Sequence, residues 1–439
     1  MMESITLRPA QPGRGGDFLI WAIRSALHPM LALMAVPSLL FLAMLTAMLL
    51  RHQSIDFYEI DRVAFCVLVI AVAGRAMVLR QRMLVVERIT WPMLGLTALT
   101  LGAVIQQPFN TETWSLLASK FLVPFALFYM AGLVFDREKR FRQFEIYALM
   151  VLAYLSFTAI AFLVGARALI FPRFILDESI GFHADRARGP FLQAVANGVS
   201  LNILGLVALH AYRRGSRRGA KVALLLTTVP IAILATMTRA VWLSFAGTLV
   251  VLVLSSGTRA LRRALVAVLL VAAAGLVLAV SPALRGALSD RLEERGPVDF
   301  RAAVYAGSWQ MFLDRPILGW GFHEMPAELP RYVSEYKDKV LYPHNTYLEV
   351  LVELGLLGFT LYVWLMWELW RLGRGAIPAE EKQGFLDAQF HRLWPIMLAV
   401  YWVNAGLVVM GYQFVNALLF TMAGMLAAQR RRAEACPAC

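Results

Sequence analysis

Long apolar runs separated by short polar segments dominate the chain. A helix needs roughly 20 apolar residues to cross the hydrocarbon core of a bilayer, and about twelve runs approach that length. We expect spans at residues 29–50, 63–79, 86–106, 115–135, 145–165, 191–211, 222–237, 240–257, 264–281, 347–370, 393–410 and 412–429. The pattern predicts an all-α polytopic membrane protein.

Composition supports this prediction over a soluble domain with an anchor. The 439 residues are 59% hydrophobic and only 16% charged, whereas a soluble domain is about half apolar and a quarter charged. The net charge of +13 would suggest a nucleic-acid partner in a soluble protein. In a membrane protein it first indicates basic cytoplasmic loops, so we expect membrane lipid and no nucleic acid as a partner.

The basic residues fall in alternate connections between the expected spans. They lie at residues 80–82, 136–142, 212–221, 258–263, 371–375 and 429–432, together with Arg8, Arg14 and Arg24 near the N-terminus. Cytoplasmic loops of membrane proteins carry an excess of Lys and Arg. Both termini are therefore expected in the cytoplasm, and the remaining connections on the opposite side.

Two connections on that opposite side are long, at residues 166–190 and 282–346. Loops of such length usually have a function or a structure of their own. The second one holds two segments with apolar residues at helical spacing, 298–316 and 327–340, with the glycine-rich ILGWGF between them. We expect three regions: spans at 1–281, a helical cap at 282–346, and spans with a tail at 347–439.

Three arginines and one histidine fall near span ends on the cap side: Arg188, Arg239, Arg301 and His344. Singly, Arg188 could reach lipid head groups, Arg301 could be the solvated face of a helix, and His344 with Asn345 could cap a helix. Together they suit the displacement of a lipid diphosphate by a hydroxyl. Guanidinium groups bind diphosphate oxygens, and an imidazole is a suitable general base at neutral pH.

Sequence patterns for a metal or a soluble nucleotide are missing. There is no Asp-x-Asp pair, no phosphate loop ending in Lys-Ser/Thr and no His-x-x-x-His spacing. Cys436 and Cys439 have metal-binding spacing, but no second pair exists to complete a zinc site. We therefore expect no cofactor and no metal, with arginine side chains in the place of a metal.

Two motifs resemble the O-antigen ligase and O-antigen polymerase family of bacterial inner-membrane glycosyltransferases. They are RPILGWGF at 315–322 and PHNTYLEVLVELGLLG at 343–358. In the family a Pro-x-x-Gly-x-Gly element leads to His-Asn-x-Tyr-Leu and then to Glu-x-Gly. Arg301 with Trp309, TMTRAVWLS at 236–244 and RARGPFLQAVANG at 186–198 resemble its arginine segments. The last of these lacks the family's Pro-Asn pair.

The resemblance implies a GT-C-like fold and a metal-independent transfer on the periplasmic face of the inner membrane. The donor would be a glycan on undecaprenyl diphosphate, and the acceptor a sugar hydroxyl of the lipid A core. By analogy His344 would be the base, and Arg188, Arg239 and Arg301 would bind the diphosphate. Asn345, Tyr347 and Glu353 are expected in supporting positions.

Three other functions are compatible with parts of this pattern. A polymerase of repeat units would use the same donor and another lipid-linked glycan as acceptor. A transporter or flippase would place ionisable or helix-breaking residues near span centres, often in two related halves, and few such residues are present. A non-enzymatic scaffold for polysaccharide export would tolerate replacement of His344.

Overall fold

The computed structural model describes residues 33–51, 60–181, 183–215, 219–255, 296–333 and 341–435. Within these ranges every regular element is a helix. The expected span at 264–281, the three N-terminal arginines, the basic segment at 258–263 and the two C-terminal cysteines lie outside the described residues.

Helices are found at all other positions where spans are expected. They are α2 (Pro37–Leu49), α3 (Ile60–Val78), α4 (Thr90–Ile105), α5 (Thr111–Leu117) continuing through η1 (Ala118–Leu122) into α6 (Val123–Val134), α7 (Glu138–Leu163), α8 (Ala194–Arg213), α9 (Gly219–Ala235), α10 (Arg239–Ser255), α15 (Thr346–Leu372), α16 (Ala388–Ala405) and α17 (Gln413–Ala435). Four continuous helical stretches, beginning at residues 113, 138, 194 and 346, are long and apolar enough to cross a membrane. The protein is thus an all-helical membrane protein, and the number of spans stays a prediction.

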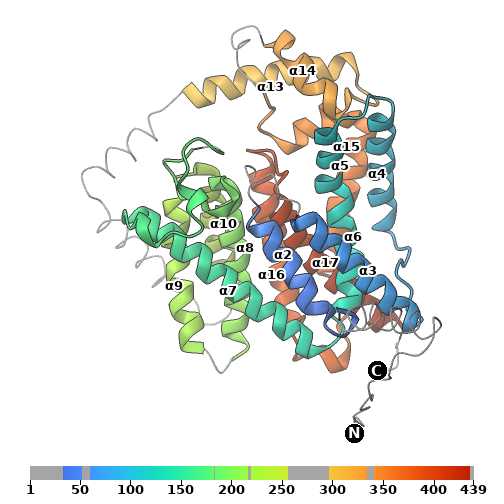
Figure 1. The fold of residues 1–439 in the computed structure, drawn as a ribbon, viewed down its shortest axis with the longest axis vertical. Helices are drawn as coiled ribbons and strands as arrows, with labels where there is room; N and C mark the ends of the chain where they lie inside the picture. The colour runs from blue at the N-terminus through green and yellow to red at the C-terminus, as the bar shows by residue number, and fades with distance from the viewer. Residues whose placement is uncertain are drawn as a thin grey trace, which may run out of the picture.

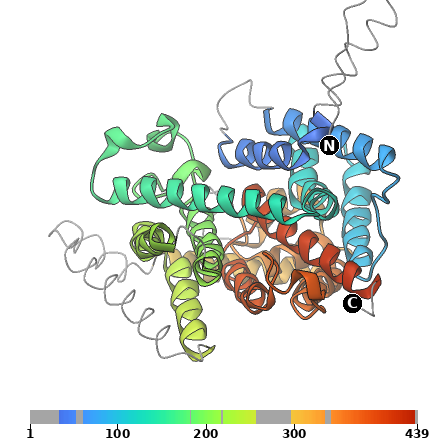
Figure 2. The ribbon, with the colours of Figure 1, turned by 90° about the horizontal axis from the view of Figure 1, so that it is seen from below.

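The helices pack around α8, which is enclosed along its whole length. α7 runs obliquely across α8 and α9, and α17 packs along α6 (Figures 1 and 2). α16 lies between α8 and α15 and contacts both. Because α8 is buried on every side from Ala194 to Ala211, it has the character of a helix surrounded by other helices.

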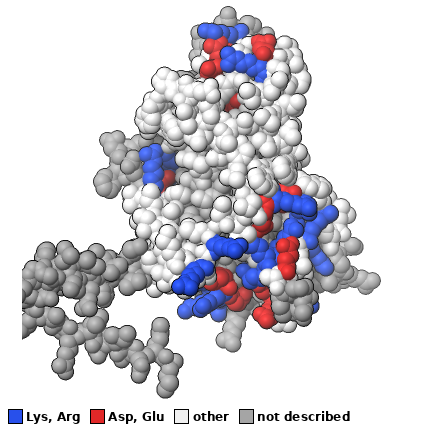
Figure 3. Space-filling view, turned by 90° about the vertical axis from the view of Figure 1, so that its right-hand side faces the viewer, with Lys and Arg blue, Asp and Glu red and all other residues white. Residues whose placement is uncertain are grey.

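Charged side chains gather at the two ends of the bundle (Figure 3). The surface between them is largely uncharged on the face shown, apart from one charged patch at its left edge, as expected for a surface mostly in contact with lipid tails. We call the end that carries α13 and α14 the cap end, and the opposite one the tail end. Ion pairs at the tail end include Arg75–Asp136, Arg214–Glu145, Arg371–Glu368 and Arg432–Glu381.

The cap consists of α13 (Gly296–Asp314) and α14 (Gly321–Tyr332), which lie above α15 and α4 (Figure 1). α13 coincides with the first helical segment expected in the cap. α14 begins at Gly321, so the prediction that the second helix starts at residue 327 was wrong. Gly319 and Gly321 both have positive φ; they turn the chain within two residues and let the helix start early.

Candidate active site

His344 lies directly before α15, beneath the cap helix α13. Its φ of 49° is in the left-handed region that non-glycine residues rarely adopt. The Tyr305 hydroxyl of α13 donates to the His344 carbonyl at 3.2 Å, and the Phe300 ring meets the imidazole edge to face, with centroids 6.0 Å apart. The surrounding cap therefore holds a strained backbone conformation of the kind that often occurs at functional sites.

Asn345 caps the N-terminus of α15. Its side-chain oxygen accepts hydrogen bonds from the backbone N–H groups of Tyr347 and Leu348, at 3.0 and 3.2 Å. These bonds satisfy two of the donors that a helix start leaves without a partner. The expectation that Asn345 holds the helix start is confirmed.

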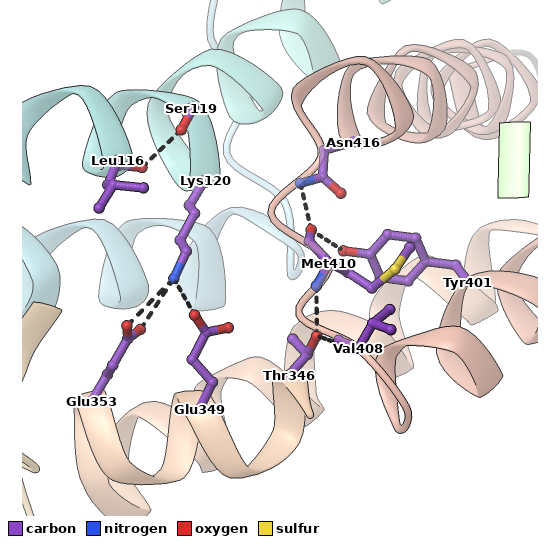
Figure 4. Close-up of polar contacts among 10 residues, drawn as sticks. All are labelled: Leu116, Ser119, Lys120, Thr346, Glu349, Glu353, Tyr401, Val408, Met410 and Asn416. Carbon is purple, nitrogen blue, oxygen red and sulfur yellow. Dashed lines mark hydrogen bonds and ion pairs between the residues drawn. The ribbon is translucent and has the colours of Figure 1, made fainter. Parts of the chain in front are cut away.

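The start of α15 is also tied to the segment that follows α16. Thr346 donates its hydroxyl proton to the Val408 carbonyl at 2.9 Å and accepts from the Met410 N–H at 2.8 Å (Figure 4). Tyr347 donates to the Trp402 carbonyl at 2.9 Å. The residues on the C-terminal side of His344 are thus fixed, which limits the positions available to the imidazole.

Arg301 is the charged neighbour that most affects His344. Burial is the main cause that lowers the pKa of the His344 imidazole, followed by the positive charge of Arg301 and then by His183. The pKa shift keeps the ring neutral at neutral pH, so a nitrogen lone pair is available to accept a proton. Of the expected diphosphate-binding residues, Arg301 is the one that the structure brings to His344.

Arg188 has a different environment from the one expected. Its side chain is 1% exposed. Its Nε donates to the Ile175 carbonyl at 3.0 Å, one Nη to the Ile180 carbonyl at 2.6 Å, and the other Nη to the Asp177 carbonyl. The guanidinium is therefore surrounded by its own loop, where it satisfies buried carbonyls, and offers almost no surface to a diphosphate.

Arg239 is the first residue of α10 and is exposed. The turn before it contains Met237 in the left-handed region, with φ 46°. The Ala187 N–H donates to the Ala235 carbonyl at 3.1 Å, which places this turn beside the loop that carries His183 and Arg188. Arg239 thus presents its guanidinium at the cap end, next to the loop that also reaches His344.

The ILGWGF segment hydrogen bonds to α15 where that helix is broken. Gly355 interrupts α15 with φ 65° and ψ −168°. The Trp320 N–H donates to the Val352 carbonyl at 2.9 Å, and the Leu356 N–H donates to the Pro316 carbonyl at 2.8 Å. A Cβ on Gly355 would lie 2.2 Å from the Ile317 oxygen, so no larger residue fits. This contact fixes the cap over α15.

Residues 222–363 match a family model described as O-antigen ligase. The resemblance to that family is confirmed. The matched segment includes Arg239, Arg301, His344 and the contact between the cap and α15, and it leaves Arg188 outside. No curated protein matches the chain.

The part of α15 that lies within the family match carries two buried glutamates, and their partner lies outside that match. The Lys120 ammonium of η1 is 2.8 Å from a Glu349 oxygen and 3.3 Å from a Glu353 oxygen (Figure 4). The π-helical turn of η1 widens the helix at Lys120. Glu353, expected only as a supporting residue, thus joins α15 to the span of α5 and α6. A lone lysine in an apolar run was the signal that could have revealed it.

Side chains that could bind a metal do not cluster in the part of the chain that the structure describes. Among the residues that the structure describes, no three His, Cys, Asp or Glu side chains lie close enough together to hold a metal ion. The charged groups around His344 that act on its pKa are Arg301 and His183. The site has the chemistry to accept a proton and to bind an anion.

Proposed function

We propose that the protein is a glycosyltransferase of the ligase type. It moves a glycan from undecaprenyl diphosphate to a sugar hydroxyl of the lipid A core, on the periplasmic face of the bacterial inner membrane. The observation that carries the proposal is a half-buried imidazole, His344, kept neutral beside the guanidinium of Arg301 under a cap that is fixed to α15. The family match over residues 222–363 supports it.

In the proposed reaction His344 takes the proton of the acceptor hydroxyl. The hydroxyl oxygen then forms a bond to the anomeric carbon of the donor sugar, while the bond from that carbon to the diphosphate oxygen breaks. The leaving undecaprenyl diphosphate gains negative charge, which Arg301 and Arg239 stabilise. We propose the transfer as independent of metal, with the two guanidinium groups supplying the positive charge that a metal would otherwise supply.

In this proposal Arg188 does not bind the diphosphate directly. Its three carbonyl contacts shape the loop at 175–188, and this loop carries His183 toward His344 and contacts the turn before Arg239. Arg188 is then a positioning residue for the two groups that lie beside the substrates. Its replacement would act through the fold of the loop.

The test is transfer by the purified full-length protein in lipid nanodiscs. A defined glycan on undecaprenyl diphosphate serves as donor, and lipid A core or a second lipid-linked repeat serves as acceptor. We expect product on the lipid A core, and a loss of roughly 10²- to 10⁴-fold for His344→Ala with the melting temperature retained. Transfer only to the lipid-linked repeat would instead show a polymerase. Wild-type transfer by His344→Ala would contradict the proposed mechanism.

A further inference from the structure

A hollow of about 480 Å³ opens at the cap end, beside the candidate active site. It is bounded by the ends of α2 and α3, by α5, by the loop before α8 and by the start of α17. The residues on its wall whose chemistry matters here are Arg51, Arg62, Ser115, Phe191, Tyr412 and Gln413. Neither arginine belongs to the motifs that resemble the O-antigen ligase family.

One wall of the hollow is positively charged. The charged residues that line it are Arg51 and Arg62. Arg51 donates to the Gln413 side-chain oxygen at 2.7 Å, and Arg62 donates to the Ser115 hydroxyl at 3.1 Å. The carboxylate of Asp61 lies behind Arg51 at 3.8 Å. Among the residues that the structure describes here, two guanidinium groups and one carboxylate leave an excess of positive charge, which favours an anionic ligand.

Apolar side chains line other parts of the hollow, at Met48, Leu49, Leu116, Leu192 and Phe414, next to the hydroxyl groups of Thr111 and Ser119. The adjoining surface of α3 is apolar and exposed at Ile60, Val63 and Ile70, as expected for a helix that faces lipid. A cavity with a cationic wall and apolar walls at the edge of a membrane suits an amphiphile. Its anionic head group would contact the arginines, and its chains would lie along the apolar walls.

Two segments that line the hollow continue toward the candidate active site. The Met410 N–H is bonded to Thr346, two residues from His344, and the next residues of the same segment, 411–414, line the hollow. Leu192 lines it from the loop of Arg188; this residue is 4% exposed and has φ 53°. Such a strained, buried leucine occurs where the surroundings fix the backbone at a functional site.

We propose that this hollow binds the phosphate-bearing head group of a second lipid substrate, the acceptor, while Arg239 and Arg301 bind the diphosphate of the donor. The assignment of the head group to the acceptor rests on the proposed function. Binding of a phosphate-bearing amphiphile at Arg51 and Arg62 rests on the hollow alone. A phosphate group suits two guanidinium groups, because each can present parallel donors to its oxygens.

The test compares two probes by native mass spectrometry of the full-length protein in detergent. The first probe is dilauroyl phosphatidic acid, which stands for the acceptor head group, and dilauroylglycerol is its control without a phosphate. The second probe is farnesyl diphosphate, which stands for the donor. We expect the double variant Arg51→Gln/Arg62→Gln to weaken phosphatidic acid binding roughly tenfold and to leave farnesyl diphosphate binding unchanged. Leu116→Trp, which fills the hollow and leaves both charges in place, should weaken phosphatidic acid binding as well. Arg331→Gln, an exposed cap arginine paired with Glu328, is the matched control.

Three results would overturn the inference. Equal binding of phosphatidic acid and dilauroylglycerol would show that the phosphate is not recognised. Full competition by millimolar inorganic phosphate would show a site for the free ion and not for an amphiphile. Weaker farnesyl diphosphate binding in the double variant would assign the hollow to the donor. A different result would contradict the proposed function: unchanged farnesyl diphosphate binding in Arg239→Gln, because Arg239 would then not bind the donor diphosphate.

Discussion

The loop at 166–190 and the turn at 236–238 lie side by side at the cap end. Arg188 in the loop and Arg239 directly after the turn were both expected to bind the diphosphate. In the loop, the guanidinium of Arg188 is enclosed and donates to three backbone carbonyls. In the turn, Arg239 is exposed at the start of α10. The difference teaches that a charged residue near a span end can serve either the fold or the substrate. In this comparison the two arginines differ in burial: Arg188 is 1% exposed and Arg239 is exposed.

Arg239→Ala should have the largest effect on catalysis of any change in this comparison. If the exposed guanidinium stabilises the leaving diphosphate, its loss should lower transfer by roughly 10²- to 10³-fold, which corresponds to about 3–4 kcal/mol of transition-state stabilisation. The melting temperature should stay at the wild-type value, because an exposed side chain is removed. Initial rates in nanodiscs and a thermal melt measure the two quantities. A normal rate would remove Arg239 from the site.

Arg188→Ala should show the opposite pattern, with its main effect on stability. Three backbone carbonyls would lose their donor, and that of Ile175 is buried. We expect a loss of about 2–3 kcal/mol in the free energy of unfolding, with less transfer because the loop is displaced. Arg173→Ala is the matched control. Arg173 lies in the same loop and also donates to two carbonyls, but it is exposed. An Arg188→Ala protein with wild-type stability and weak farnesyl diphosphate binding would restore the direct role expected from the sequence.

Much of the fold could be predicted from the sequence, because apolar runs and basic connections reflect the chemistry of a bilayer. The helix at 298–316 and the cap by Asn345 also followed from local patterns. The role of Arg188 could not be predicted, since its acceptors are backbone carbonyls. Every residue has a backbone carbonyl, so residue types do not show which ones accept a hydrogen bond. Lys120 was missed for a related reason: its partners Glu349 and Glu353 lie more than 200 positions away.

Gly355→Ala should displace the cap and leave the Arg301 guanidinium in the chain, so it tests whether the position of the cap matters for transfer. The new Cβ would meet the Ile317 carbonyl, and φ would stay in the left-handed region. We expect a loss of about 1–3 kcal/mol in stability and weaker transfer, because Arg301 would no longer be held over His344. Gly102→Ala in α4 is the control. A Cβ there has nothing within 4 Å, so stability should be unchanged or slightly higher. Equal behaviour of the two variants would show that the contact at Gly355 is unimportant.

Arg301→Gln should lower transfer, because this guanidinium also stabilises the leaving diphosphate. Its smallest and most specific effect is a change in the pH dependence of the transfer that remains. The reaction needs a neutral imidazole, so the rate rises with pH through the pKa of His344. The positive charge of Arg301 lowers this pKa, after burial, and its removal should therefore raise the pKa and move the acidic limb of the profile of kcat/KM to higher pH. His183→Asn should move the limb in the same direction by less, because His183 contributes less to the shift. Arg239→Gln should lower the rate without moving the limb. An acidic limb that stays in place in Arg301→Gln would mean that the group titrating in the profile is not His344.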